Sequence, residues 1–131
     1  MGANENRATV VAAYEAFGRG DIAAVIGINS PDAVWAIHTS ANATFAGEHK
    51  GHDGIGAMFQ TIVDSVDISM FDMQPVAAEG DVVVATGQQS YTVKATGKTV
   101  SGPLVHVMTF NADGQLMRFE EWESNADEAW R

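Results

Sequence analysis

A histidine and a glutamate in the last third of the chain have the residue types and the spacing for acid–base chemistry. His106 and Glu121 stand fifteen positions apart, on either side of a glycine-containing turn. If the flanking segments pair as antiparallel strands, both side chains project from one face, opposite or diagonal to each other. A carboxylate among apolar groups is poorly solvated and can act as a base, while a neighbouring histidine can shuttle a proton or donate to an oxyanion. The pair indicates either proton-transfer catalysis or a buried structural ion pair.

Apolar side chains surround this pair on its face of the hairpin. By alternation, that face carries Leu104, Met108 and Phe110 from the first strand and Met117, Phe119 and Glu123 from the second. The opposite face, with residues such as Val105 and Trp122, is also partly apolar. An antiparallel sheet with two apolar faces typically covers a core or pocket with one of them and meets a second subunit with the other. We therefore expect a pocket on the His106 face and a homodimer formed through the sheet.

Several other side chains are candidates for contact with a small apolar molecule in this pocket. His38 ends a strand-like segment and either binds a polar substrate group or lies in solvent. Tyr14 lies on the apolar stripe of a helix and either points its hydroxyl into the pocket or bonds to backbone in the core. Soft and aromatic residues complete the expected substrate-binding set, namely Trp35, Phe59, Met108 and Phe119.

A second group of histidines and carboxylates has the residue types of a metal site. Glu48, His49, His52 and Asp53 lie within six residues and combine imidazole and carboxylate ligands. They fall in a glycine-bounded loop, which would not hold three ligands in place, and His52 and Asp53 also suit the start of a helix. We therefore expect no metal here.

The elements that position these residues change in type halfway along the chain. Apolar spacing predicts a helix around 10–17, a second after Asp21 as its N-cap, and a third from Ile55 with Asp53 as its N-cap. A short strand at 33–38 and a loop at 39–54 separate the last two helices. Four strands are predicted, at 67–79, 81–94, 98–110 and 115–123, with glycine-containing turns between them. Helices followed by an antiparallel meander predict one α+β domain over residues 1–131, with three N-terminal helices on one face of a curved sheet.

The composition narrows the class of partner. Seventeen acidic residues against seven basic ones give a formal net charge of −10, which repels phosphate backbones and anionic membrane surfaces. We expect no nucleic-acid or membrane partner. There is no cysteine, no apolar run of about 20 residues and no signal-peptide pattern, so a cytoplasmic location is the default expectation.

The same hairpin resembles a specific enzyme family. Val105–Met108, the Gly114 turn and the pair Glu121-Trp122 are similar to the Val-His-x-Met, glycine-turn and Asp-Trp pattern of SnoaL-type polyketide cyclases. Ser101-Gly102 also resembles a Ser-Gly of that family. A looser similarity to the nuclear-transport-factor-like superfamily, which includes ketosteroid isomerases, covers nearly the whole chain, with Gly20–Ile22, Phe45–Ile55 and the Gly97 turn.

The resemblance implies an α+β cone around a deep apolar pocket, usually dimeric, that works without a metal or cofactor. It implies that Glu121 is the base that removes an acidic proton so that an enolate closes a ring by aldol addition, with His106 assisting. The chain departs from the pattern by Glu in place of Asp and by a hairpin that is one residue longer. Ile37 and Ala12 occupy the positions of the isomerase base and tyrosine, which argues against steroid isomerisation by the usual route.

Three functions are compatible with these features. The first is a small cofactor-independent enzyme that performs aldol cyclisation or isomerisation on an apolar carbonyl compound. The second is a non-catalytic module that binds a small hydrophobic ligand, and the third is a dimerisation domain with a filled pocket. An epoxide hydrolase of this fold would need an Asp-Arg-Asp set, whereas the inward candidates here are Glu and His. An open cavity distinguishes the first two functions from the third.

Overall fold

Two helices begin the chain, as the sequence predicts. The computed structural model describes residues 2–131, in which α1 spans Ala3–Gly18 and α2 spans Ile22–Gly27. The predicted N-cap of α2 is confirmed, because a side-chain oxygen of Asp21 accepts a hydrogen bond from the backbone N–H of Ala24 at 3.2 Å. The apolar stripe of α1 faces inward and includes the fully buried Val10.

The segment between α2 and the third helix is more regular than the sequence suggests. It holds the strands β1 (Asn29–His38) and β2 (Gly47–Lys50), and α3 follows at Gly51–Ser65. The prediction of a loop over 39–54 is therefore wrong for its second half, which holds β2 and the first turn of α3. The sequence gives no strand signal there because β2 is a short, largely exposed edge strand without an apolar pattern. The predicted N-cap at Asp53 is also wrong. Gly51 turns directly from strand into helix with a φ of 70°, and Asp53 lies in the first helical turn.

Four long strands make up the rest of the sheet, close to the predicted bounds. They are β3 (Val66–Glu79), β4 (Val82–Val93), β5 (Thr99–Phe110) and β6 (Leu116–Glu123). Gly80, Gly97 and Gly114 adopt positive φ in the three connecting turns, which is the conformation that glycine takes most easily. The turn chemistry therefore accounts for the accuracy of these strand boundaries.

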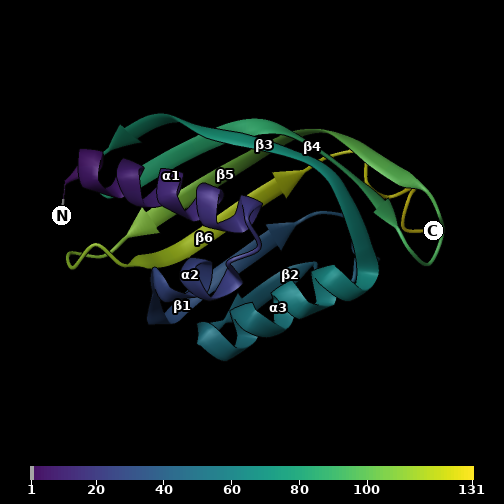
Figure 1. The fold of residues 1–131 in the computed structure, drawn as a ribbon, viewed down its shortest axis with the longest axis horizontal. Coiled ribbons are helices and arrows are strands. Elements are labelled where there is room, and N and C mark those ends of the chain that lie inside the picture. The colour runs from purple at the N-terminus through teal and green to yellow at the C-terminus, as the bar shows by residue number, and fades with distance from the viewer. Residues whose placement is uncertain (1) are drawn as a thin grey trace.

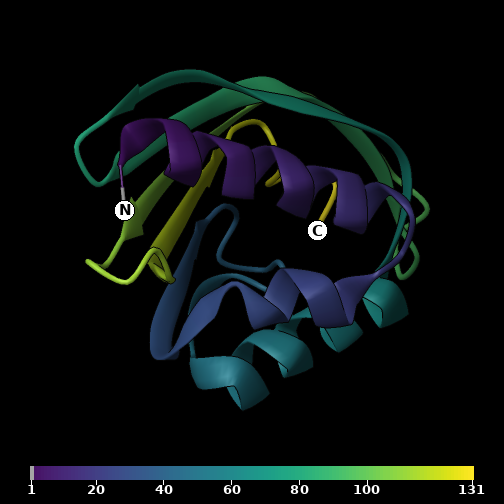
Figure 2. The same ribbon diagram turned by 60° about the vertical axis from the view of Figure 1, so that its left-hand side comes forward.

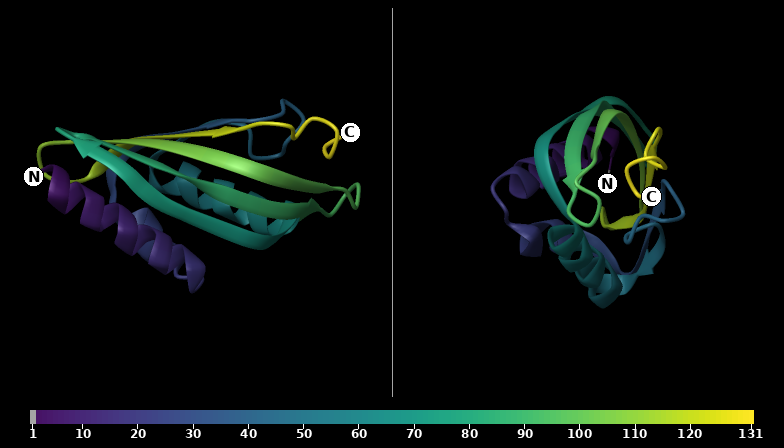
Figure 3. Two further views of the ribbon diagram at one scale, coloured as in Figure 1. Left: turned by 90° about the horizontal axis from the view of Figure 1, so that it is seen from above. Right: turned by 90° about the vertical axis from the view of Figure 1, so that its right-hand side faces the viewer.

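The strands form one six-stranded sheet in the order β2-β1-β6-β5-β4-β3. Every neighbouring pair is antiparallel except β1 and β6, which run parallel. Figures 1 and 2 show α1, α2 and α3 on one side of the sheet, and in Figure 1 the start of α1 and the C-terminal tail lie at opposite ends of the molecule. Seen along its length, the sheet curls around that side without closing (Figure 3). The predicted α+β fold with three helices on a curved sheet is confirmed.

The curl of the sheet has a local cause at the β3–β4 pair. The register shifts twice along β3, between Ile68 and Met70 and between Pro75 and Ala77, and such bulges bend a strand. At Gly87 on β4, strand β3 lies so close that a Cβ atom on residue 87 would be 1.8 Å from the carbonyl oxygen of Asp72. Only glycine fits there, so this position lets β3 wrap over the helices.

The inner face of the β5–β6 hairpin carries the residues that alternation places there, with one exception. Leu104, His106, Met108 and Phe110 are at most 3% exposed. Met117 was expected on the same face but is 44% exposed, and Leu116 is buried in its place. A register shift follows Thr109, and this bulge reverses the alternation next to the turn.

The outer face of the same hairpin exposes apolar side chains. Val105 is 37% exposed and Trp122 is 42% exposed. The homodimer expected through this face stays a prediction.

Among the helices of the described chain, none is long and apolar enough to cross a membrane.

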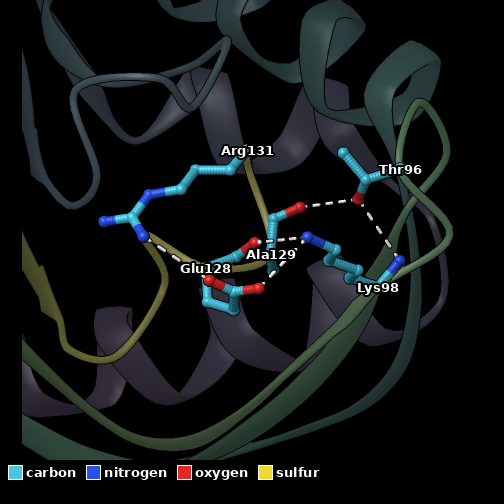
Figure 4. A network of polar contacts seen from close by, with 5 residues as sticks. All are labelled: Thr96, Lys98, Glu128, Ala129 and Arg131. Atoms are coloured by element: carbon cyan, nitrogen blue, oxygen red, sulfur yellow. Dashed lines mark hydrogen bonds and ion pairs between the residues drawn. The ribbon is translucent and has the colours of Figure 1, made fainter.

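The C-terminal tail, residues 124–131, folds back over the end of the sheet that holds the β4–β5 turn. The side chain of Thr96 in that turn donates a hydrogen bond to the carbonyl oxygen of Ala129 at 2.6 Å, and Lys98 forms an ion pair with Glu128 at 3.2 Å (Figure 4). Trp130 packs edge-on against Phe45, with ring centroids 5.4 Å apart.

Candidate functional site

His106 and Glu121 form a direct hydrogen bond across the β5–β6 hairpin. They are register partners, and Nε2 of His106 lies 2.8 Å from Oε1 of Glu121. The imidazole is almost fully buried, at 2% exposure, and the glutamate side chain retains 14%. The two strands therefore bring together the pair that the sequence singles out, with the histidine behind and the carboxylate nearer to open space.

Tyr14 extends this pair into a chain of three residues. Its hydroxyl oxygen lies 2.7 Å from Nδ1 of His106, and the two rings stack with centroids 5.8 Å apart. Burial, and then the negative charge of Glu121, raise the pKa of the Tyr14 hydroxyl, so this group stays protonated. The sequence places Tyr14 in the pocket as a substrate contact, but its hydroxyl is already bonded to the histidine.

The partners of His106 determine its tautomer. An ionised carboxylate only accepts hydrogen bonds, so Nε2 carries the proton and donates it to Glu121. Nδ1 then has a lone pair, which accepts the hydroxyl proton of Tyr14. Both nitrogens are thus engaged within the protein. The predicted contact of His106 with a substrate oxyanion would require one of these two bonds to break.

A mainly apolar cavity lies beside this chain, between the helices and the concave face of the sheet. Its lining includes Tyr14, His106 and Glu121 together with the expected contact residues Trp35, Phe59, Met108 and Phe119. Trp35 stacks on Phe119 with ring centroids 4.0 Å apart, which gives one wall a flat aromatic surface. The candidate base is therefore presented to a space suited to an apolar molecule.

The cavity is small for a ligand site. Its volume is about 100 Å³, below both the roughly 300 Å³ at which ligand pockets usually begin and the 150 Å³ cavity that takes up benzene. Phe17, Ile68 and Phe71 line it and are only partly buried, with Ile68 41% exposed. Entry of a ring-sized compound requires movement of this rim between α1 and β3.

His38 lies outside this cavity. It is on the outer face of the sheet, where its Nε2 lies 2.9 Å from a carboxylate oxygen of Glu120 and its ring stacks on Trp122. The hydrogen bond from Arg118, and then that from His38, hold the pKa of Glu120 below its usual range. The alternation of β1 explains the position, because Trp35 and Ile37 point inward and their neighbours point outward. The expectation that His38 contacts a substrate in the pocket is not met.

A second polar cluster borders the cavity at the end covered by the tail. Gln89 on β4 lines the cavity, is 7% exposed, and donates through Nε2 to a carboxylate oxygen of Glu123 at 3.1 Å. The other oxygen of Glu123 accepts a hydrogen bond from Thr39 at 2.8 Å, and burial raises the pKa of this carboxyl group. Tyr91, also in the cavity wall, accepts a hydrogen bond from the indole N–H of Trp130 at 3.2 Å.

Sequence reasoning did not find Gln89 or Tyr91. The alternation of β4 contains the signal, because both residues share the parity of Val83, Ala85 and Val93, which are completely buried. A glutamine in such an apolar row is unusual enough to mark a polar contact.

The histidines considered for a metal site are occupied by backbone contacts. Nε2 of His49 bonds to the carbonyl oxygen of Phe45 at 2.8 Å, and Nε2 of His52 bonds to that of Asn29 at 2.9 Å. Within residues 2–131, no three histidine or acidic side chains group together in a way that could hold a metal ion.

Comparison with known proteins identifies the chain at the level of family and fold. The model of the SnoaL-like domain matches residues 10–119, while no curated protein matches the sequence. The structure is similar to an NTF2-like protein from Burkholderia xenovorans, with 26% identity, 100% and 99% of the two chains covered and a TM-score of 0.85.

Two further solved structures share the fold at lower identity. A protein of Xanthomonas campestris, provisionally named a polyketide cyclase, is 21% identical, with 97% and 96% of the chains covered and a TM-score of 0.79. TerC, which was co-crystallised with polyporic acid, is 22% identical, with 96% and 98% covered and a TM-score of 0.76.

Proposed function

The chain belongs to the SnoaL-like domain family, and we propose that it is an acid–base enzyme that removes a proton from a carbon next to a carbonyl group in a small apolar compound. The observation that supports this proposal is the hydrogen-bonded chain from Tyr14 through His106 to Glu121, which ends at the wall of an apolar cavity. The similar fold of a provisionally named polyketide cyclase supports the same chemistry.

Glu121 is the base in this proposal. His106 binds one carboxylate oxygen, Oε1, and the other has no hydrogen-bond partner elsewhere in residues 2–131. Because the cavity walls are apolar, an ion–dipole contact with a substrate is not weakened there by competing water. The unpaired oxygen is the atom that takes the substrate proton.

His106 acts through Glu121 as a positioning residue. Its Nε2–H holds the carboxylate in one orientation and continues to donate when Glu121 becomes protonated on the other oxygen. Tyr14 holds the ring in the tautomer that makes this possible, in the same way that a third residue orients the base in other hydrogen-bonded catalytic groups.

The reaction balances within the substrate and Glu121. The proton leaves the carbon next to the carbonyl group and bonds to the carboxylate, while the C–H electron pair forms an enolate. The enolate carbon then either adds to a second carbonyl group of the same molecule, whose oxygen takes the proton back from Glu121 as the ring closes, or, in an unsaturated compound, the conjugated enolate takes that proton back at its far carbon, which moves the double bond. Either route returns Glu121 to the carboxylate. The cavity volume of about 100 Å³ limits the substrate to a small compound with at most one ring, and the rim between α1 and β3 must move to admit that ring.

Deuterium exchange tests the first step without knowledge of the natural substrate. Phenylacetone is a small apolar ketone whose benzylic carbon loses a proton slowly in neutral water. We expect the protein to accelerate deuterium uptake from D₂O at that carbon, measured by NMR. Glu121→Gln should lower the catalysed rate at least about 100-fold, the usual contribution of a general base.

Glu120→Gln is the matched control. Glu120 is the preceding residue on β6 but lies on the outer face, with Arg118 and His38. Its substitution should leave the exchange rate unchanged. Equal rates for the wild type and Glu121→Gln would exclude Glu121 as the base. Binding of phenylacetone without catalysed exchange would favour the alternative of a non-catalytic module for small hydrophobic ligands.

A further inference from the structure

The inner face of the sheet carries two polar clusters, one that contains Glu121 and a second that contains Gln89 and Glu123. His106 and Glu121 form the first, and Glu123 follows Glu121 on the same face of β6. Two residues of a strand span about 7 Å. In the next row of the sheet, Leu104 pairs with Glu123 on one side and with Gly87 on the other. Glu123 therefore lies about 7 Å along the strand from Glu121, a separation that a substituted benzene ring can span. Gln89 pairs with Gly102, two rows beyond His106, and its amide reaches back to Glu123.

Within the second polar cluster, Gln89 is the residue that lines the cavity. It pairs with Gly102, where a Cβ atom would meet nothing within 4 Å, so the space beside the amide is open. The bond to Glu123 fixes the amide, because a carboxylate accepts only from the N–H side and Nε2 must point toward it. The carbonyl oxygen of the amide and its second N–H have no other hydrogen-bond partner within the described chain.

Most of the cavity lining offers no hydrogen bond. Beyond the chain from Tyr14 to Glu121, Gln89 and Tyr91 are the polar side chains in its wall. The hydroxyl of Tyr91 is already engaged, because it accepts a hydrogen bond from Trp130 and shares another with Glu123. In an apolar pocket, a few placed polar groups determine orientation and specificity. Gln89 combines burial, a fixed orientation and unused hydrogen-bonding capacity.

We propose that Gln89 is a specificity-determining residue that binds a second polar group of the substrate. The substrate would then be an apolar carbonyl compound with a hydroxyl or carbonyl oxygen about one ring away from the carbon that loses its proton. Glu123 is a positioning residue in this subsite, because it holds the amide. The inference rests on the proposed function for the identity of the reacting end.

A matched pair of ketones tests the subsite by equilibrium binding. 4-Hydroxyphenylacetone differs from phenylacetone only in a hydroxyl group across the ring. We expect the wild type to bind the hydroxylated ketone about 5–10-fold more tightly, the effect of one neutral hydrogen bond. Gln89→Met keeps the length and volume of the side chain but should remove this preference while still binding phenylacetone.

Gln88→Met is the control. Gln88 is the preceding residue on β4 and is exposed on the opposite face, so its substitution should retain the full preference for the hydroxylated ketone. Equal affinity of the wild type for the two ketones, or a preference that persists in Gln89→Met, would overturn the proposal. Failure of both ketones to bind up to their solubility limits would also overturn it.

A second measurement decides the question if Gln89→Met does not fold. The side-chain amide signals of Gln89 in the ¹⁵N spectrum of the wild type should shift with 4-hydroxyphenylacetone and not with phenylacetone. Unshifted signals at saturation would contradict the subsite.

The two proposals fail in different ways. Glu121→Gln should lose deuterium exchange and keep the hydroxyl preference. A hydroxyl preference in a wild type that does not exchange would reject the base and leave Gln89 as a ligand contact. Catalysed exchange that depends on Glu121 without any hydroxyl preference would reject the Gln89 subsite alone.

Discussion

The hydroxyl of Tyr14 on α1 lies 2.7 Å from Nδ1 of His106 on β5, although 92 residues separate them in the sequence. This contact joins the helical layer to the centre of the sheet and leaves the histidine with both nitrogens engaged. The contact from α1 therefore helps to fix the tautomer of His106, and His106 in turn orients the proposed base, Glu121.

Removal of the Tyr14 hydroxyl should affect both stability and catalysis. In Tyr14→Phe, Nδ1 of His106 is buried without a partner, so we expect the free energy of unfolding to fall by about 1–2 kcal/mol. The ring nitrogens of His106 should become a mixture of tautomers, visible in their ¹⁵N chemical shifts, and catalysed exchange should fall about tenfold.

The control for this prediction is the other tyrosine of the cavity wall. Tyr91→Phe removes a hydroxyl that bonds to Trp130 and not to His106. It should leave the histidine tautomer unchanged even if it lowers stability. An unchanged tautomer in Tyr14→Phe would show that Glu121 alone orients the ring.

The sequence is most informative where a single hairpin carries the signal. The pair His106 and Glu121 could be placed on one face because strand alternation and a glycine turn fix the relation between neighbouring strands. The contact between Tyr14 and His106 could not, since it depends on how α1 lies on the sheet. Alternation along β1 also groups His38 with every second residue of the strand. It does not tell which face of the sheet is buried, and His38 lies on the outer face.

The remaining differences arise from irregular backbone. The bulge after Thr109 moved Met117 to the surface and Leu116 into the core, and no residue type marks such a bulge. β2 lacks the apolar alternation of a strand because it is an exposed edge. Alternation along β4 places Gln89 in the buried row of that strand. Its hydrogen-bond acceptor, Glu123, lies two strands away and cannot be predicted from β4 alone.

Glu123 should make stability depend on pH. Burial raises the pKa of its carboxyl group in the folded protein above the value in the unfolded chain, so the folded state holds this proton more tightly. The resulting stabilisation is complete at pH values below the unfolded pKa of about 4.3 and is lost as the pH rises through the folded pKa. Glu123→Gln resembles the protonated form, so the wild type should lose stability relative to this variant between pH 4 and neutrality, as measured by denaturant unfolding.

Glu120→Gln provides a comparison of opposite sign. The pKa of Glu120 is lowered by Arg118 and His38, so its contribution is present at neutral pH and is lost as the pH falls. A stability difference between the wild type and Glu123→Gln that does not change with pH would contradict the raised pKa of Glu123.

Trp130 should contribute to stability through the tail. Its ring packs edge-on against Phe45 and its indole N–H bonds to the hydroxyl of Tyr91, so it covers one end of the cavity wall. We expect Trp130→Ala to lower the free energy of unfolding by about 2–4 kcal/mol, as for other large aromatic truncations. Arg131→Ala removes only an exposed ion pair with Glu128 (Figure 4) and should change stability by less than about 0.5 kcal/mol. Equal stability of the two variants would show that the tail does not pack as described.

Asn6 is a buried amide without a hydrogen bond to any residue of 2–131, and its replacement should stabilise the protein. Its side chain on α1 is 1% exposed, and neither the oxygen nor the nitrogen has a partner in that part of the chain. An unpaired buried polar group costs about 1–3 kcal/mol, and leucine has a similar shape without that cost. We expect Asn6→Leu to raise the free energy of unfolding by about 1 kcal/mol. Asn4→Leu, at an exposed position of the same helix, should have almost no effect. A destabilising Asn6→Leu would contradict the prediction and would indicate either a misfit of leucine in the core or an amide that is satisfied by a buried water molecule.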